Sequence, residues 1–278
     1  MRSGCLILLA FLAAPAAVSA QEPPAASGLP TLPPAPPAPP LLENTGKPIR
    51  LPFQCTLDDI QAAGLACSDD DPCPVYLELT TVESVGNRIF AAGNLHTQTV
   101  TVSSALIGSE DAGHTWREVH GRLRTSTLDR IQFLDPETGW ISGESVSPLP
   151  QDPFLLLTTD GGKTWLQREV FDENAENHLG MIQAFAFTAR DAGTLIIDRG
   201  QGSDSDRYEL YESADGGQSW GFRQSSQKQL RLKQPPVPNP EWRIRADRAS
   251  AAFILEHRQG PKWGTVASFL VKVGVCKP

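Results

Sequence analysis

The chain has 278 residues, with 24 basic against 32 acidic side chains and a net charge of −8 at neutral pH. This acidic balance disfavours nucleic acid and anionic membranes as partners, because both are bound through clustered positive charge. Beyond a short apolar run near the N-terminus, no apolar stretch reaches the roughly 20 residues that a membrane-spanning helix needs.

Residues 1–20 have the pattern of an export signal. Arg2 supplies a positive charge, residues 6–12 are apolar, and small residues lead to a cleavage site after Ala20. We therefore expect the mature protein to work outside the cytoplasm, in the periplasm or as a secreted protein.

Residues 21–47 are rich in proline and alanine and include "PTLPPAPPAPP" at 30–40. Such a run favours extended polyproline II structure and cannot bury a core, which predicts a semi-rigid spacer. A docking peptide for a proline-binding domain is the less favoured alternative.

Residues 48–74 are expected to form a small cysteine-containing cap. Thr56 with Asp59 three positions later resembles a capping box, and Gly64 is a typical stop, so a short helix is predicted at about 57–63. The run Asp69, Asp70 and Asp71 could hold calcium. A solvated turn is the simpler interpretation, because no second set of ligands follows at the spacing of a calcium loop.

Residues 75–278 are predicted to be all-β. Short runs such as "VYLELTTV", "FLLLTT" and "YELYES" are rich in β-branched and aromatic residues and are separated by Gly, Asp and Pro. No helical periodicity of useful length accompanies them, and the runs allow about ten to sixteen strands.

Three stretches in this region share one pattern: "DAGHTW" from Asp111, "DGGKTW" from Asp160 and "DGGQSW" from Asp215, at spacings of 49 and 55 residues. The repeated positions are Ser109, Asp111, Gly113, Thr115 and Trp116; Thr158, Asp160, Gly162, Thr164 and Trp165; and Ser213, Asp215, Gly217, Ser219 and Trp220. The flanking β runs predict a four-stranded unit with the pattern between its third and fourth strands. A degenerate fourth copy fits residues 256–263, with Arg258 in place of the Asp.

Each residue type in the pattern suits a tight hairpin. The glycine tolerates positive φ, the aspartate accepts hydrogen bonds from backbone amides of the turn, and the tryptophan buries a large ring at the start of the next strand. The aspartates are therefore predicted to be structural, with no catalytic or metal-binding role. Four-stranded units must stack to bury both faces, which predicts about four propeller blades, either closed or forming an incomplete ring.

The pattern Ser/Thr-x-Asp-x-Gly-x-Thr/Ser-Trp resembles the Asp-box, or bacterial neuraminidase repeat, of β-propellers, over roughly residues 75–275. The succession "FLDPETGWISGE … LLLTTDGGKTWLQ" (133–167) is similar to the photosystem II assembly and stability factor type of propeller. That resemblance implies a non-enzymatic binding scaffold, although the chain has about four repeats where that family typically has seven.

The Asp-box also occurs in sialidases, so we searched for their chemistry. Sialidases have an Arg-Ile-Pro element, an arginine triad and a Tyr nucleophile paired with Glu. This chain lacks Phe-Arg-Ile-Pro and has only Tyr76, Tyr208 and Tyr211. None of its carboxylates stands in an informative context for a glycosidase pair. The five histidines have no zinc-site spacing, and no nucleophile elbow or phosphate loop is present. No catalytic, metal or cofactor residue is predicted.

The leading hypothesis is therefore a non-enzymatic scaffold that recognises another exported protein or a glycan. Recognition is expected from loops 145–153 and 199–207, which join second and third strands and should lie opposite the Asp turns. The alternative is a sialidase-like glycoside hydrolase with an unrecognised carboxylate pair.

An even number of cysteines in an exported protein predicts disulfides. The mature chain would have four, which can form two disulfides in three possible pairings: Cys55, Cys67, Cys73 and Cys276. We favour Cys55–Cys276 with Cys67–Cys73. The residues before Cys276 are predicted to form the outermost strand of the last blade, whereas Cys73 should introduce an innermost strand. The helix predicted between Cys55 and Cys67 would hold those two apart.

Overall fold

The structure is a computed structural model that describes residues 39–147, 149–200, 206–233 and 241–277. The expected export signal (1–20) and residues 21–38 of the expected spacer lie outside these ranges. Within them, no helix is long and apolar enough to cross a membrane.

The fold is all-β and propeller-like, as predicted. The described residues form four antiparallel sheets and one short helix, α1 (Leu57–Ala62). The first sheet has the order β1-β5-β4-β3-β2-β17: β1 (Leu42–Glu43), β5 (Thr115–Glu118), β4 (Thr101–Ser109), β3 (Arg88–His96), β2 (Cys73–Val85) and β17 (Lys272–Cys276).

The other three sheets follow chain order. The second contains β6 (Ser126–Phe133), β7 (Gly139–Ser145), β8 (Gln151–Thr158) and β9 (Leu166–Glu169). The third contains β10 (Met181–Phe187), β11 (Gly193–Asp198), β12 (Tyr208–Ser213) and β13 (Gly221–Ser226). The fourth contains β14 (Trp242–Asp247), β15 (Ala252–Gln259) and β16 (Lys262–Leu270).

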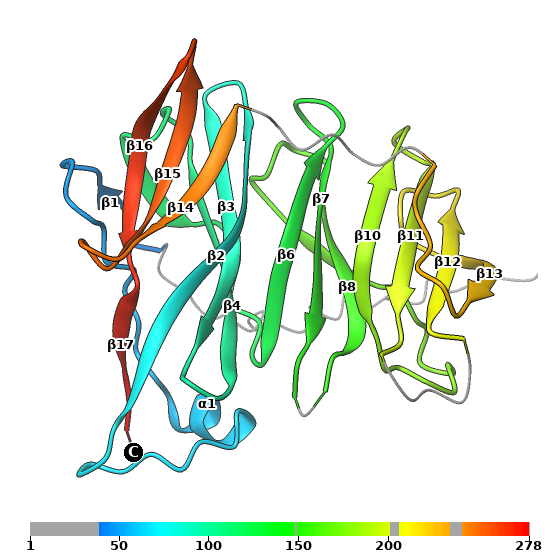
Figure 1. Cartoon of the computed structure of the whole chain (residues 1–278), viewed down its shortest axis with the longest axis horizontal. Helices are drawn as coiled ribbons and strands as arrows, with labels where there is room; N and C mark the ends of the chain where they lie inside the picture. The colour runs from blue at the N-terminus through cyan, green and yellow to red at the C-terminus, as the bar shows by residue number, and fades with distance from the viewer. Residues whose placement is uncertain (1–38, 148, 201–205, 234–240, 278) are drawn as a thin grey trace, which may run out of the picture. The chain divides into compact units, whose positions relative to one another are not determined.

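The sheets pack face to face in the order fourth, first, second, third (Figure 1). β14 lies against β2, β4 against β6, and β7 against β10. Strands between two sheets are buried on both faces, so β3 and β7 are buried along nearly their whole length and lack a polar side.

Three hydrophobic clusters fill the spaces between neighbouring sheets. Phe269 and Leu255 of the fourth sheet pack with the first sheet, Phe90 of the first packs with Ile141 of the second, and Trp140 of the second stacks on Phe187 of the third at 3.7 Å between ring centroids. Apolar burial between sheets is therefore the main favourable contribution to this stacking.

The described sheets do not close into a ring. Among the described residues, β10–β13 make no extensive contact with β14–β16, which lie at the other end of the stack (Figure 1). The free face of the third sheet is covered instead by the chain itself: Leu230 and Leu232 pack on Ile196 and Tyr208.

Two strands depart from the predicted blades. The run "GTVASFLVKVGVC" was read as one outermost strand, but it divides into β16 of the fourth sheet and β17, which pairs with β2 of the first sheet. The fourth sheet therefore has three described strands. Its tryptophan, Trp263, lies under the guanidinium of Arg243, 4.2 Å from the ring centroid, and not among the buried core residues.

The end of the expected spacer also takes part in the fold. β1 pairs with β5, with Leu42 opposite Trp116, and Leu42 packs on the first core cluster. The Asn44 side chain donates hydrogen bonds to the carbonyls of Gly113 at 2.8 Å and Val266 at 2.7 Å. Residues 42–44 thus join the first sheet to the fourth.

The cap is tied down by two disulfides, Cys55–Cys276 and Cys67–Cys73. These are the favoured pairs, but the reason given for them was wrong. β17 pairs with β2, and its register places Cys276 directly opposite Cys73. Two disulfides are compatible with an extracytoplasmic location, where such bonds persist.

Candidate functional site

The three Asp turns, residues 109–116, 158–165 and 213–220, share one hydrogen-bond arrangement. In the second turn, Asp160 Oδ1 accepts hydrogen bonds from the amide of Thr164 at 2.9 Å and the hydroxyl of Thr158 at 2.9 Å, while Oδ2 accepts from the Thr164 hydroxyl at 2.7 Å. Asp111 and Asp215 make the equivalent bonds. All three carboxylates are therefore engaged within their own turns.

These contacts also set the acidity of the three carboxylates. Burial alone would raise the pKa of Asp160, but hydrogen bonds from Thr164, Thr158 and the Lys163 amide lower it to about 2. The pKa values of Asp111 and Asp215 are likewise lowered to about 2. A carboxylate held in the ionised form is a poor general acid, and this favours the structural role.

The strand register places the β7–β8 connection of the second sheet and the β11–β12 connection of the third at the end opposite the Asp turns. We call this end the loop end. Gly139 pairs with Thr158 beside the second Asp turn, whereas Ser145 pairs with Gln151 at the other end of the same strands. In the third sheet, Asp198 pairs with Tyr208 at the loop end.

The first predicted recognition loop is shorter than expected, whereas the second has the predicted bounds, 199–207, between β11 and β12. Because β8 begins at Gln151, the first connection spans 146–150, and residue 148 lies outside the described residues. Residues 201–205 of the loop 199–207 also lie outside them.

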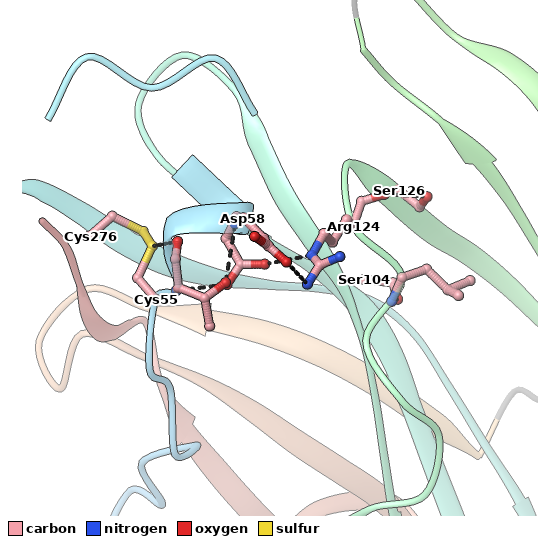
Figure 2. Close-up of polar contacts among 9 residues, drawn as sticks. Cys55, Asp58, Ser104, Arg124, Ser126 and Cys276 are labelled. Atoms are coloured by element: carbon pink, nitrogen blue, oxygen red, sulfur yellow. Dashed lines mark hydrogen bonds and ion pairs between the residues drawn. A yellow bond between two sulfur atoms is a disulfide. The ribbon is translucent and has the colours of Figure 1, made fainter. Parts of the chain in front are cut away.

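A polar recess of about 470 Å³, the cap hollow, lies between the cap and the first sheet at the loop end. Its lining residues are Phe53, Gln54, Thr56, Asp59, Ser103, Arg122, Leu123 and Arg124. The cap side is fixed by the Cys55–Cys276 disulfide, and the sheet side is the connection between β5 and β6 (Figure 2).

Arg124 connects the two sides of the cap hollow. Its guanidinium lies 3.1 Å from Asp59 Oδ1 and 3.2 Å from Asp58 Oδ2, and Figure 2 shows the Arg124 and Asp58 side chains pointing toward one another. Burial would raise the pKa of Asp59, but hydrogen bonds from Thr56 and Arg124 lower it below its usual value. The Asp59 side chain also accepts a bond from the Thr56 amide at 2.9 Å, which completes the capping box of α1.

Hydrogen bonds with neighbouring serines hold the sheet side of the cap hollow in place. The Ser104 hydroxyl accepts a hydrogen bond from the Leu123 amide at 2.9 Å, and the Ser126 hydroxyl donates to the Arg124 carbonyl at 2.9 Å. The Ser103 side chain is 3% exposed, and its hydroxyl has no hydrogen-bond partner among the described residues. Arg122 lies over the Phe53 ring, 5.4 Å from its centroid.

A second polar feature is the carboxylate pair Glu144 and Asp129, on β7 and β6 of the second sheet. Glu144 accepts a hydrogen bond from the Thr127 hydroxyl at 3.0 Å and is 5% exposed. Burial, together with the nearby charge of Asp129, raises the pKa of Glu144 to about 7, despite the Thr127 bond. Burial also raises the pKa of Asp129. Neither carboxylate lines the cap hollow or three other recesses in the described part of the chain.

A Tyr–Glu–Arg cluster that the sequence did not suggest lies in the third sheet. Tyr211 donates a hydrogen bond to Glu209 at 2.7 Å, and Arg199 lies 2.7 Å from Glu209. Burial and the Glu209 charge raise the pKa of Tyr211 to about 12. This shift opposes a nucleophilic role, because a nucleophile needs its proton removed.

Asp69, Asp70 and Asp71 are exposed at a turn in which the Asp71 amide donates to the Ser68 hydroxyl at 3.0 Å. Over the described ranges, no group of three or more His, Cys, Asp or Glu side chains is placed to hold a metal ion.

The sequence reasoning missed the cap hollow and the acidic pair. The cap hollow depends on a contact between residues about 65 positions apart, Asp59 and Arg124, which no local motif marks. Glu144 had a weak local signal, because it directly follows the buried run "GWISG" of a central strand.

No family model matches the chain, and no curated protein matches it. Among solved structures, the chain is similar to an α-L-arabinofuranosidase from Fusarium graminearum in complex with an iminosugar inhibitor. The TM-score is 0.30 and the identity 15%, over 71% of this chain and 59% of that enzyme's chain. A similarity this low carries no argument about function.

Proposed function

We propose that this protein is an exported, non-enzymatic binding or assembly scaffold, which recognises another extracytoplasmic protein or a glycan through its loop end. The observation that carries the proposal is the cap hollow, a polar recess bounded by a disulfide-tied cap at the end where sheet connections gather. Connections positioned by a rigid scaffold are the usual place for recognition.

Two further observations support this proposal. The carboxylates of the three Asp turns make their bonds inside the turns, which leaves those turns a structural task. The repeated pattern also resembles the Asp-box of exported propellers, including the photosystem II assembly factor type. We take the scaffold role from that resemblance and leave photosystem assembly aside.

Affinity capture tests the proposal. The mature chain, from Gln21, is immobilised and exposed to an extract of its own cell envelope, and retained proteins and glycans are identified by mass spectrometry. We expect a partner that is retained by the wild type and lost by Arg124→Ala. A partner profile identical to that of an unrelated immobilised propeller would contradict the proposal.

Glycoside hydrolysis is the second candidate, and the Glu144–Asp129 pair favours it. A carboxyl group with a pKa near 7 beside a second acid is the combination that a glycosidase general acid requires. Release of reducing sugar from a glycan panel, abolished by Glu144→Gln but not by Glu209→Gln, would favour the hydrolase over the scaffold.

A further inference from the structure

A groove at the outer rim of the second and third sheets has the lining of a ligand site. It has a volume of about 600 Å³, within the usual range for small-molecule sites. One wall is Gln167, Arg168, Glu169, Val170, Phe171 and Asp172, and the other is Gln218, Ser219 and Trp220 of the third Asp turn. We call it the rim groove.

The strands β5 and β9 both end in Arg-Glu and are followed by Val, at 117–119 in the first sheet and 168–170 in the second. The two copies are offset by two positions relative to the tryptophan of the Asp turn, because Arg117 directly follows Trp116 whereas Arg168 lies three residues after Trp165. An equivalent recess lies beside the first copy, against Gly162 and Lys163 of the second Asp turn. A recess between the last strand of a repeat unit and the next Asp turn therefore occurs twice, and the charged residues of the two recesses can be compared.

The two copies use their charges differently. In the first, Arg117 is paired with Glu110 at 2.5 Å and Glu118 with Arg122 at 2.7 Å. In the second, no side-chain hydrogen bond or ion pair joins Arg168 or Glu169 to the part of the chain that the structure describes; the Arg168 Nε is buried without a partner, and Glu169 is exposed. A half-buried guanidinium whose N–H has no hydrogen-bond partner destabilises the folded protein. A bound molecule with suitable acceptor atoms would remove this destabilisation.

The rest of the rim groove adds aromatic and amide groups. Phe171 is 8% exposed and is held by Arg199, whose guanidinium lies 4.3 Å from the ring centroid. Gln218 donates its side-chain amide N–H to the Asp215 carbonyl at 2.9 Å, which leaves its side-chain oxygen available to accept a further hydrogen bond. Trp220, which is half-buried, also lines the rim groove.

We propose that the rim groove binds a neutral oligosaccharide. Adjacent unpaired charges of opposite sign, Arg168 and Glu169, disfavour a polyanion, whereas sugar hydroxyls both accept from a guanidinium and donate to a carboxylate. An aromatic ring offers the apolar surface that packs against the C–H face of a sugar. The rim groove shares no lining residue with the cap hollow.

Isothermal titration with cellohexaose, chitohexaose and maltohexaose tests the assignment, with a heparin hexasaccharide as the anionic probe. We expect saturable binding of at least one neutral probe. Arg168→Ala should weaken it about tenfold or more, because a hydrogen bond to a charged group contributes about 1.5–3 kcal/mol. Arg117→Ala removes an arginine that lines the corresponding recess of the first sheet and is already paired with Glu110, so it is the control and should bind like the wild type.

Binding of none of the neutral probes, binding of heparin alone, or equal losses in the two arginine variants would overturn the proposal. Circular dichroism melting verifies that each variant is folded, and Glu169→Gln replaces Arg168→Ala if the latter is not. Capture of the loop-end partner should be unchanged in Arg168→Ala, so the two proposals fail separately.

Discussion

At the residue scale, the Asp turns owe their shape to two consecutive residues with positive φ. Gly161 and Gly162 have φ values of 72° and 84°, and Gly216 and Gly217 have 77° and 90°. The first turn has Ala112 at 58° before Gly113, so a side chain occupies a backbone conformation that normally favours glycine. The first turn is therefore the most strained of the three.

Replacing this alanine should stabilise the protein. We expect Ala112→Gly to raise the free energy of unfolding by up to about 1 kcal/mol, because the left-handed conformation then costs less. Gly216→Ala is the matched control at the same position of the third turn. Its new Cβ would lie 2.8 Å from the Arg190 carbonyl oxygen, so we expect destabilisation. Urea unfolding measures both, and a loss of stability in Ala112→Gly would contradict this account.

The turn carboxylates make stability depend on pH in the acid range. The folded pKa of Asp160 is about 2, below its ordinary value of 3.8, so the unfolded state binds the proton more tightly. This stabilisation is complete above pH about 4 and is lost as the pH falls through about 2. Asp160→Asn should reduce the acid-dependent loss, measured by urea unfolding at several pH values. An unchanged pH profile would show that the turn does not hold the ionised form.

The carboxyl group of Glu144 should make the free energy of unfolding depend on pH in the opposite direction from Asp160. Its folded pKa, about 7, lies above its ordinary 4.5, so the folded state holds the proton more tightly. The contribution is fully present below pH about 4.5 and is lost as the pH rises through about 7. We expect Glu144→Gln to flatten the decline in unfolding free energy between these values. A decline as steep as in the wild type would place the titrating group elsewhere.

At the element scale, the long-range disulfide should stabilise more than the local one. Cys55 and Cys276 are 221 positions apart, whereas Cys67 and Cys73 are separated by 6. In the chain-entropy model a larger closed loop restricts the unfolded chain more, so removing Cys55–Cys276 should cost about 3–5 kcal/mol and removing Cys67–Cys73 about 2 kcal/mol. Paired Cys→Ser variants, compared by urea unfolding, test this order.

The tryptophan after each turn should matter more than the aspartate. Trp165 is 6% exposed and packs edge-on against Phe90 and Phe133 at 5.9 Å. Trp165→Ala would leave a cavity between the first and second sheets and should cost about 3–5 kcal/mol. Asp160→Ala removes turn hydrogen bonds and should cost about 1–3 kcal/mol. Equal losses in thermal and urea unfolding would contradict this ranking.

Local patterns predicted the elements that depend on local physics. The positive-φ glycines, the capping box at Thr56 and Asp59 and the all-β class all follow from short-range preferences. The strands with which β1 and β17 pair do not follow from local preferences, because "LE" and "KVGVC" have no feature that selects one sheet edge over another. The cap hollow and the unpaired Arg168 were missed for the same reason, since each depends on which distant residues are brought together.

At the scale of the whole described fold, the two ends of the sheet stack are finished in different ways. Leu230 and Leu232 cover the third sheet, while the fourth sheet presents Arg243 stacked on Trp263 and paired with Glu256 at 2.6 Å. A row of stacked sheets needs such end faces to stay soluble when it does not close.

The central claim is that the repeated turns maintain the fold while the loop end recognises the partner. The most direct test measures partner retained per mole of folded protein for Arg124→Ala and Asp160→Ala, side by side with their thermal melting. The account predicts that Asp160→Ala melts at a lower temperature and, while folded, retains its partner, whereas Arg124→Ala loses it. A folded Asp160→Ala that loses the partner while Arg124→Ala keeps it would contradict the account.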